Sequence, residues 1–265
     1  MISVSKFVTL GAIQLRRDLI YRADFLLSLL VTPTILIVNY FIWKAVFSTG
    51  TQTVAGMTFA EMLTYIVLAQ LISIFIFNAT SNTLQQKVQS GELGQDLLKP
   101  IHPFISLLAA ALTSRSIALF LEVIPLAVIS WFLFKPQIPI SAVSIFFVFS
   151  LLLALILNFI MSLIIGLIAF WTIRIEAFQW LTWIVLRVFS GEFFPISLFP
   201  GWFQAVSRFL PFEYLRYRVA LIALNNSFSS AMITILSQIV WIILLGVFAW
   251  WLWNVVVRRF TIAGG

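Results

Sequence analysis

Long apolar runs alternate with short polar segments along the chain, and the length of the runs predicts the fold. A hydrocarbon core about 30 Å thick needs about 20 apolar residues of helix at 1.5 Å per residue. Six segments approach this length: 25–47, 59–79, 104–134, 142–171, 177–189 and 231–257. The fifth segment, 177–189, is shorter than the others and is interrupted by Arg187. The pattern therefore predicts an all-α, polytopic membrane protein with six transmembrane helices.

Residues 1–24 mix apolar and basic positions at a roughly helical period. This pattern predicts an N-terminal amphipathic helix that lies in the membrane plane, with Arg16, Arg17 and Arg22 as interfacial anchors. A solvated tail is the alternative. No small-residue cleavage site follows the first apolar run, so we expect that run to remain as a membrane anchor. The transmembrane domain is then expected to occupy residues 25–265.

Composition narrows the classes of function. The chain is 62% hydrophobic and 9% charged, compared with an apolar content of about 45–50% in soluble domains. It has no cysteine, a single histidine (His102) and no GxxxxGK[ST] sequence, so a thiolate site, a histidine metal cluster and a phosphate loop for ATP are not expected. The net charge of +7 favours loops held at an anionic membrane leaflet over binding of nucleic acid.

The distribution of lysine and arginine predicts the orientation. Six crossings place both termini on one side, and that side has more basic residues: Lys6, Arg16, Arg17, Arg22, Lys87, Lys99, Arg174, Arg258 and Arg259. The opposite side has Lys44, Lys135, Arg208, Arg216 and Arg218. We therefore expect cytoplasmic termini. The opposite segment, 190–230, is apolar and contains Pro195, Pro200 and Pro211, which predicts short helices in the outer interface.

The loop at 80–103, which contains SGELGQDLLKP, interrupts the apolar pattern most strongly. A polar helix over 81–88 is expected to end near Gly91, and Pro100 to end a second short helix. Leu93, Leu97 and Leu98 would form an apolar stripe on this second helix, beside Glu92 and Asp96, which are four residues apart. Such a stripe on a cytoplasmic loop predicts a partner surface. The alternative is that the stripe packs under its own bundle.

Charged residues inside the predicted crossings are costly and normally face protein or water. Arg115 and Glu122 are seven residues apart, so we expect them on one helix face, as a structural pair, as a contact in the substrate path or as headgroup anchors. Arg187 is interpreted as an interface anchor. Ion pairs of Glu192 and Glu213 with nearby arginines are expected in the outer segment, and Gly166 and Gly246 are candidates for close helix packing.

Two segments resemble one family. GELGQDLLKP is similar to the G-E-L-x-x-x-L-L-x-P segment between the second and third crossings of ABC-2 type transporter permeases, the membrane subunits of ATP-binding-cassette exporters. SGEFFPISLFPGWFQAVSRFLPFEYLRY, residues 190–217, resembles the segment before the last crossing of that family. The two stand in family order and the likeness extends over the whole chain. Arg218 departs from the pattern, since many relatives are expected to have proline there.

This resemblance implies a mechanism and a set of partners. It implies a permease of the bacterial cytoplasmic (inner) membrane. Two permease chains, identical or related, would work with two ABC ATPase subunits, and the ATPase subunits would bind ATP and magnesium. Its coupling helix would contact the ATPase through Leu93, Leu97 and Leu98. Glu92 and Asp96 would pair with cations on the ATPase. Gly91 and Pro100 would fix the direction in which the helix leaves the membrane. The outer re-entrant helices would close the pathway through Gly191, Glu192, Pro195, Pro200 and Pro211.

Sequence analysis thus predicts efflux of an amphiphilic or lipid-like substrate, with no bond chemistry in this chain. An intramembrane enzyme is disfavoured because the carboxylates are scattered and the chain has one histidine and no cysteine. A channel or scaffold that works without ATP is the remaining alternative.

Overall fold

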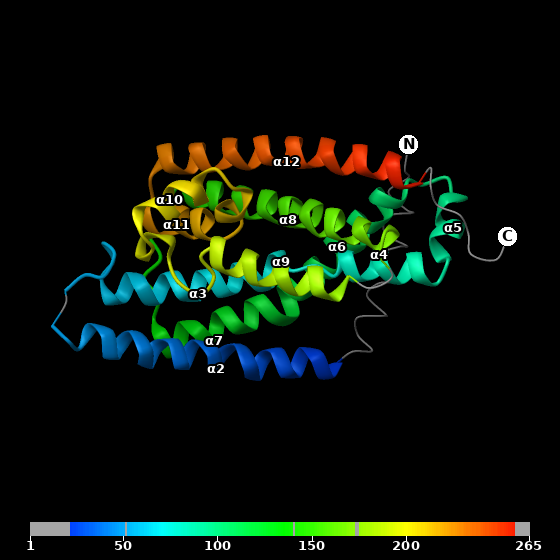
Figure 1. Cartoon of the computed structure of the whole chain (residues 1–265). Coiled ribbons are helices and arrows are strands. Elements are labelled where there is room, and N and C mark those ends of the chain that lie inside the picture. The colour runs from blue at the N-terminus through cyan, green and yellow to red at the C-terminus, as the bar shows by residue number, and fades with distance from the viewer. Residues whose placement is uncertain (1–21, 51, 140, 173–174, 258–265) are drawn as a thin grey trace.

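The computed structural model describes residues 22–50, 52–139, 141–172 and 175–257, which form a helical bundle (Figure 1). Its longer helices are α2 (Arg22–Phe47), α3 (Phe59–Ile76), α6 (Pro103–Ala118), α7 (Ile124–Phe134), α8 (Ser144–Leu167) and α12 (Phe228–Val257). Its shorter helices are α4 (Thr80–Gln89), α5 (Glu92–Leu97), α9 (Glu176–Phe189), α10 (Gly201–Arg208) and α11 (Tyr217–Asn225). No β-strand occurs in these ranges, and the prediction of an all-α chain is confirmed.

Five helical stretches of the described chain are long and apolar enough to cross a membrane: Leu29–Phe47, Phe59–Gln89, Pro103–Phe134, Ser144–Phe170 and Phe228–Val257. They correspond to five of the six predicted crossings. The other, α9, has 14 residues and is about 21 Å long, which is too short to span the hydrocarbon core alone. The predicted interfacial helix and the anchors Arg16 and Arg17 lie outside the described residues, and so does the side chain of Arg22, the first residue of α2.

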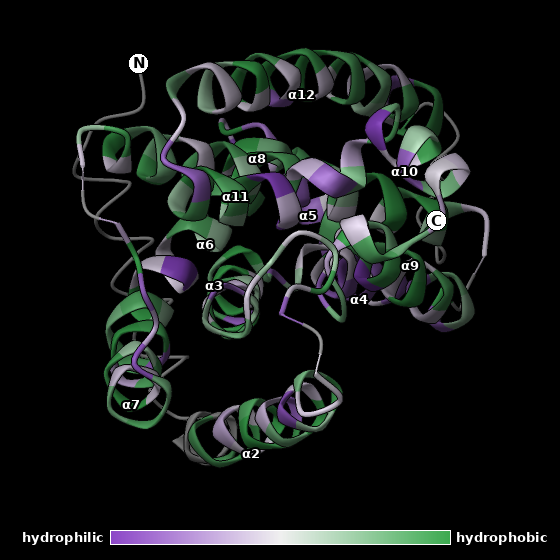
Figure 2. Cartoon of the chain, turned by 90° about the vertical axis from the view of Figure 1, so that its left-hand side faces the viewer, coloured by the Kyte–Doolittle hydropathy of each residue, from purple (hydrophilic) through white to green (hydrophobic). Residues whose placement is uncertain are grey.

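The bundle has two distinct ends. Figure 1 shows the start of α2 and the finish of α12 at the same end as α4 and α5, which we call the α5 end. Helices α10 and α11 lie at the opposite, α10 end, and α9 runs between the two. Figure 2, viewed along the bundle, places α2 and α7 on one side and α8, α11 and α12 on the other, with α3 between them.

Local sequence explains where several helices begin. Thr58 and Glu61 form a capping box at α3: the Thr58 amide donates to Glu61 Oε2 at 2.8 Å, and the Glu61 amide donates to Thr58 Oγ1 at 3.4 Å. At α6, the Nδ1 atom of His102 accepts a hydrogen bond from the Phe104 amide at 3.2 Å. Pro103 is the first residue of α6, a position that needs no amide donor.

Close packing joins α4 to α8. A Cβ atom on Gly166 would lie 3.0 Å from the Cα atom of Ser81 and 3.1 Å from the Cβ atom of Leu84, so a side chain at this position would push the helices apart. The predicted role of Gly166 in close packing is confirmed. The corresponding prediction for Gly246 is wrong, because a Cβ atom there would meet nothing nearer than Ile160 at 3.9 Å.

The segment at 190–230 does contain short helices: η3 (Ile196–Leu198), α10, η4 (Pro211–Tyr214) and α11. Helix α10 exposes Trp202, and the next residue after its C-terminal end, Phe209, is 81% exposed. Helix α11 differs from the prediction, because Val219 and Ala220 are fully buried and the helix packs in the core instead of resting at an interface. Gln238 of α12 holds the segment in place by donating to the Tyr214 carbonyl at 2.9 Å.

The third predicted crossing contains a π-helical turn, η1 (Leu119–Val123), between α6 and α7. A π-helical turn breaks the period of 3.6 residues, so the seven-residue spacing alone does not place Arg115 and Glu122 on one face. Arg115 still interacts electrostatically with Glu122, so the structural pair stays a prediction. The guanidinium of Arg115 also donates to the Ile74 carbonyl and to Ser114 Oγ, both at 3.1 Å. Arg115 thereby connects α6 to the end of α3.

Candidate functional site

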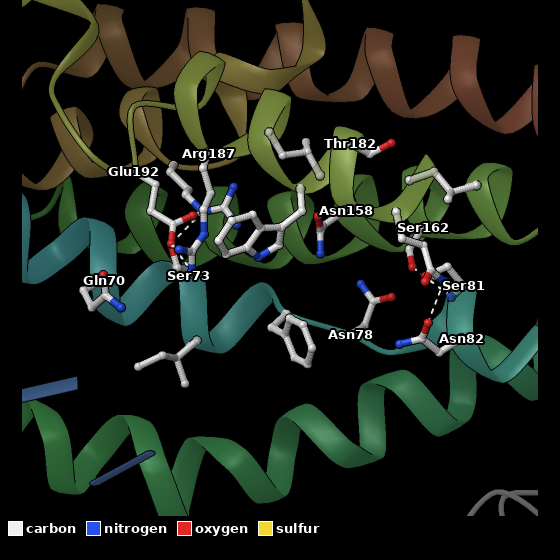
Figure 3. Close-up of a pocket in the computed structure, with 17 residues that line it drawn as sticks. Gln70, Ser73, Asn78, Ser81, Asn82, Asn158, Ser162, Thr182, Arg187 and Glu192 are labelled. Carbon is white, nitrogen blue, oxygen red and sulfur yellow. Dashed lines mark hydrogen bonds and ion pairs between the residues drawn. The ribbon is translucent and has the colours of Figure 1, made fainter. Parts of the chain in front are cut away.

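A polar cavity of about 310 Å³ lies between the α3–α4 segment, α8 and α9 (Figure 3). Figure 3 shows Arg187, Glu192 and Ser73 toward one end of it, Ser81, Asn82 and Ser162 toward the other, and Asn78 and Asn158 between them. The helices around it are otherwise strongly apolar. The polar residues that line it are Gln70, Ser73, Asn78, Ser81, Asn82, Asn158, Ser162, Gln179, Thr182, Arg187, Glu192 and Arg216.

The second candidate span is broken beside this cavity. Residues 77–79 separate α3 from α4 and have no helical conformation. Side chains of α8 satisfy the freed backbone groups: Asn158 Nδ2 donates to the Ile76 carbonyl at 2.7 Å, and Ser162 Oγ accepts from the Ser81 amide at 3.0 Å. Irregular backbone at membrane depth is tolerated where protein satisfies it or where it lines a cavity, and broken helices often mark transport sites.

Three charged side chains form a cluster at one end of the cavity, which we call the buried triad. Arg187 Nη2 lies 3.1 Å from Glu192 Oε1, and Arg216 Nε lies 3.2 Å from Glu192 Oε2. The exposed fractions of the three side chains are 28% for Arg187, 4% for Glu192 and 10% for Arg216. Two guanidinium groups share one carboxylate, so the triad has one unit of positive charge in excess.

The turn that follows α9 fixes the triad against α3. The Tyr65 hydroxyl donates to the Gly191 carbonyl, and Arg216 donates to Ser73 Oγ at 2.6 Å and to Ser190 Oγ at 3.0 Å. Gly191 has a φ of +75°, and a Cβ atom on it would lie 2.7 Å from the Tyr65 hydroxyl oxygen. Only glycine fits this turn, which separates the cavity from the α10 end.

At the α5 end, the predicted coupling residues divide into buried and exposed sets. Leu93 is fully buried in a cluster with Leu84 and Trp253, so it has no exposed surface for an ATPase contact. Leu97 is 37% exposed and Leu98 is 88% exposed. The apolar stripe therefore fulfils both interpretations in part: one leucine packs under the bundle and two face outward.

The charged residues of this loop also divide. Asp96 accepts hydrogen bonds from Lys87 at 2.5 Å and from Lys99 at 2.6 Å, so it is already paired within the chain. Burial alone would raise the pKa of Asp96, but the bonds and charges of the two lysines outweigh it and lower the pKa. Glu92 is exposed at the start of α5, after Gly91, whose φ of +76° permits the turn.

The structure brings together charges that sequence analysis assigned separately. Glu192 pairs with Arg216 and Glu213 with Arg218, as expected for the 190–230 segment. Arg187 was expected to anchor at the interface but lies in the triad, because the turn at Ser190 and Gly191 brings Glu192 back to it. Pro195 and Pro200 directly precede η3 and α10, and Pro211 begins η4.

Sequence analysis missed the polar cavity, although a signal for it is present. The lining residues recur at helical spacing inside apolar runs: Gln70 and Ser73, then Asn158 and Ser162, then Gln179, Thr182 and Arg187. Polar stripes of this kind, on several predicted crossings at once, indicate helices that face a shared polar space.

Comparison with known families agrees with this architecture. No match was found among curated proteins. The family described as ABC-2 family transporter protein matches residues 34–264, which include all of the candidate spans except the first residues of α2. Members of this family are multi-pass membrane subunits of transporters, which associate in general with an ATP-binding subunit. The match covers most of the sequence, and the chain therefore belongs to the ABC-2 transporter family.

Proposed function

We propose that this chain is the permease subunit of an ABC exporter, which moves an amphiphilic or lipid-like substrate outward with energy from a separate ATPase. The observation that carries this proposal is the exposed tip of α5. Leu98, which directly follows α5 at the end of the bundle, is 88% exposed, and a large apolar side chain in that position is well suited to a groove on a partner.

The contacts behind the tip supply a path for motion. Leu93 joins α5 to Leu84 of α4, and the Lys87–Asp96 ion pair joins the same two helices. Helix α4 in turn follows directly from the break at 77–79 that lines the cavity. A displacement of α5 by the ATPase is therefore expected to shift α4 and change the shape of the cavity.

Membrane topology follows from the same proposal. The α5 end is cytoplasmic, together with both termini, in a bacterial inner membrane. Helix α9 is the fifth crossing, and because it is short, the turn at 190–192 and the segment with α10 complete it from the outer side as re-entrant elements. Gly191, Glu192, Pro195, Pro200 and Pro211 then belong to the outer closure of the pathway.

The working assembly contains two permease chains, identical or related, and two ATPase chains that bind ATP and magnesium. The pairing of two permeases follows from the family resemblance, and α9 offers a surface for it, because Trp180 is 64% exposed and Leu181 is 62% exposed. Such side chains suit either lipid or a second permease. The direct coupling contacts are Glu92, Leu97 and Leu98, while Leu93 and Asp96 hold α5 on α4.

Replacing Leu98 by arginine tests the proposal. We expect Leu98→Arg to insert normally but to lose co-purification with the ATPase subunit from the same genome and stimulation of its ATP hydrolysis. Phe209→Arg is the matched control, since Phe209 is 81% exposed near the other end of the bundle. If Leu98→Arg keeps full ATPase assembly and stimulation, the coupling assignment is wrong, and a channel or scaffold that works without ATP becomes the better interpretation.

A further inference from the structure

The buried triad has a charge imbalance that the rest of the described chain near the cavity does not correct. Among the residues that line the cavity, the charged ones are Arg187, Glu192 and Arg216. One unit of positive charge therefore remains in a region surrounded by apolar helices. An uncompensated charge in such surroundings costs several kcal/mol, so a bound anion would be strongly favoured.

Arg187 and Arg216 differ in how many of their guanidinium N–H groups have a hydrogen-bond or ion-pair partner. Arg216 is 10% exposed and contacts Ser73, Ser190 and Glu192. Arg187 is 28% exposed, and within the described ranges its polar contact is the one to Glu192. A guanidinium has five N–H donors, so most of those on Arg187 have no hydrogen-bond partner from the described chain.

The position of Arg187 is fixed by aromatic rings. Its guanidinium carbon lies 4.0 Å from the centre of the Trp183 ring and 5.3 Å from that of the Phe193 ring. Stacking of this kind leaves the edge of the guanidinium free to bind an oxyanion in a bidentate manner. Trp183 and Arg187 both line the cavity, so this edge is accessible from it.

An unused acceptor lies next to this donor. Glu192 Oε2 lies 3.2 Å from Arg216 Nε but accepts no hydrogen bond from a described residue, because Arg216 donates its Nε hydrogen to Ser73 Oγ. A carboxylate oxygen repels an anion, so this acceptor suits a water or a hydroxyl donor of a ligand, while an oxyanion would contact Arg187. The cavity holds about ten water volumes, which is enough for a polar headgroup but not for a whole lipid.

From these observations we propose that the cavity binds the anionic headgroup of an amphiphile, with Arg187 as the residue that contacts the oxyanion. This inference rests on the proposed transport function and specifies its substrate class: an amphiphile with a carboxylate, sulfate or phosphate group. Amide and hydroxyl side chains, such as Asn78, Asn158 and Thr182, offer further hydrogen bonds to the headgroup. The apolar lining residues Ile74, Phe77, Ile165 and Leu186 contact its first carbons.

Binding to the purified full chain in phosphatidylcholine nanodiscs tests the inference without the ATPase. The probes are dodecyl phosphate, dodecyltrimethylammonium and inorganic phosphate, measured by titration calorimetry. We expect dodecyl phosphate to bind and the cationic amphiphile not to bind. If inorganic phosphate binds more weakly than dodecyl phosphate, the alkyl chain contributes to binding and the ligand is an amphiphile. If the two bind equally, the assignment of an amphiphile is overturned.

Arg187→Gln is the decisive variant, since it leaves Arg216 and Glu192 as a balanced pair. A charge-assisted hydrogen bond contributes about 1.5–3 kcal/mol, so we expect dodecyl phosphate to bind about 10- to 100-fold more weakly. Arg208→Gln, at an exposed site on α10, is the matched control and should bind as the wild type does. Unchanged binding by Arg187→Gln overturns the inference. If that variant does not fold, the anion and cation titrations of the wild type decide the question.

The same variants separate this inference from the proposed function. Leu98→Arg is expected to lose ATPase coupling while it still binds dodecyl phosphate, because Leu98 lies at the α5 end, away from the cavity. Arg187→Gln is expected to keep ATPase assembly while it loses the anion. If the first variant behaves as expected but the wild type binds no anion, the permease assignment stands and only the substrate class is wrong.

Discussion

Two clusters in this chain have the same charges and different surroundings. At the α5 end, Lys87 and Lys99 share Asp96, and beside the cavity, Arg187 and Arg216 share Glu192. The Lys99 side chain is 65% exposed, so water and salt can compensate the excess positive charge of the first cluster. The second cluster has less access to solvent, since its more exposed cation, Arg187, is 28% exposed and its carboxylate is 4% exposed, compared with 12% for Asp96.

The comparison explains why the two clusters are assigned different roles. Exposed ion pairs contribute about 0–1 kcal/mol, so the lysine cluster serves mainly to hold α5 on α4. A buried ion pair is costly to break, because the remaining charge stays without a partner. The arginine cluster is therefore a rigid element that also attracts an anion, and the predictions below test this difference.

The largest effect is expected for Glu192→Gln. This substitution leaves Arg187 and Arg216 close together without their carboxylate, and breaking such a buried pair costs about 3–5 kcal/mol. We expect a marked fall in the midpoint of thermal unfolding in detergent. Glu92→Gln, at an exposed carboxylate, is the control and should unfold as the wild type does. Equal midpoints for Glu192→Gln and wild type would show that the triad does not stabilise the bundle.

The fold was largely predictable because one physical constraint dominates it. Apolar runs must match the thickness of the membrane, and the predicted segment 231–257 differs from α12, Phe228–Val257, by only three residues at its start. The short helix α5 was predictable as well, because Gly91 and Pro100 mark its limits. The π-helical turn at Leu119–Val123 was missed, although a signal for it is present: Pro125 has no amide hydrogen to donate to the Leu121 carbonyl, which lies within the turn.

The candidate site was harder to predict because it joins distant parts of the chain. Arg216 meets Ser73, which is 143 residues away, and Asn158 meets the Ile76 carbonyl, 82 residues away. Helical periodicity gives the face on which a residue lies, but not which face of another helix it meets. Burial of Leu93 beside the exposed Leu98 was unpredictable for the same reason.

A smaller effect is expected where α4 links the two clusters. Gly166→Ala would place a Cβ atom 3.0 Å from Ser81 Cα, and overpacking of this kind costs about 1–3 kcal/mol. We expect a lower midpoint of thermal unfolding and faster proteolysis of the α4–α5 loop. Gly246→Ala is the matched control, since its nearest contact is at 3.9 Å. If the two variants are equally stable, α4 is not held tightly on α8.

Asp96→Asn should have a weaker effect that depends on salt. Removing the carboxylate leaves two lysines that repel each other, but both are partly exposed, so the expected loss is about 1 kcal/mol or less. Thermal unfolding in 0.05 M and 1 M NaCl measures this, and the difference from wild type should shrink at high salt. The Glu192→Gln difference should stay nearly constant over the same range. A salt-independent Asp96→Asn effect would remove the contrast between the clusters.

The smallest effect concerns pH at the α5 end, where His102 caps α6 and stacks on Trp250 at 5.1 Å. Burial lowers the pKa of His102 below its ordinary value of 6.5, and protonation would also remove the acceptor that caps the Phe104 amide. The unfolded chain then binds the proton more tightly than the folded one, so stability is constant above pH 6.5 and falls as the pH drops below it. We expect the unfolding midpoint to decrease by about 1–2 °C between pH 7.5 and 5.5. His102→Asn, which caps without titrating in this range, should lack this His102-dependent decrease, and an equal decrease in both proteins would assign it to other groups.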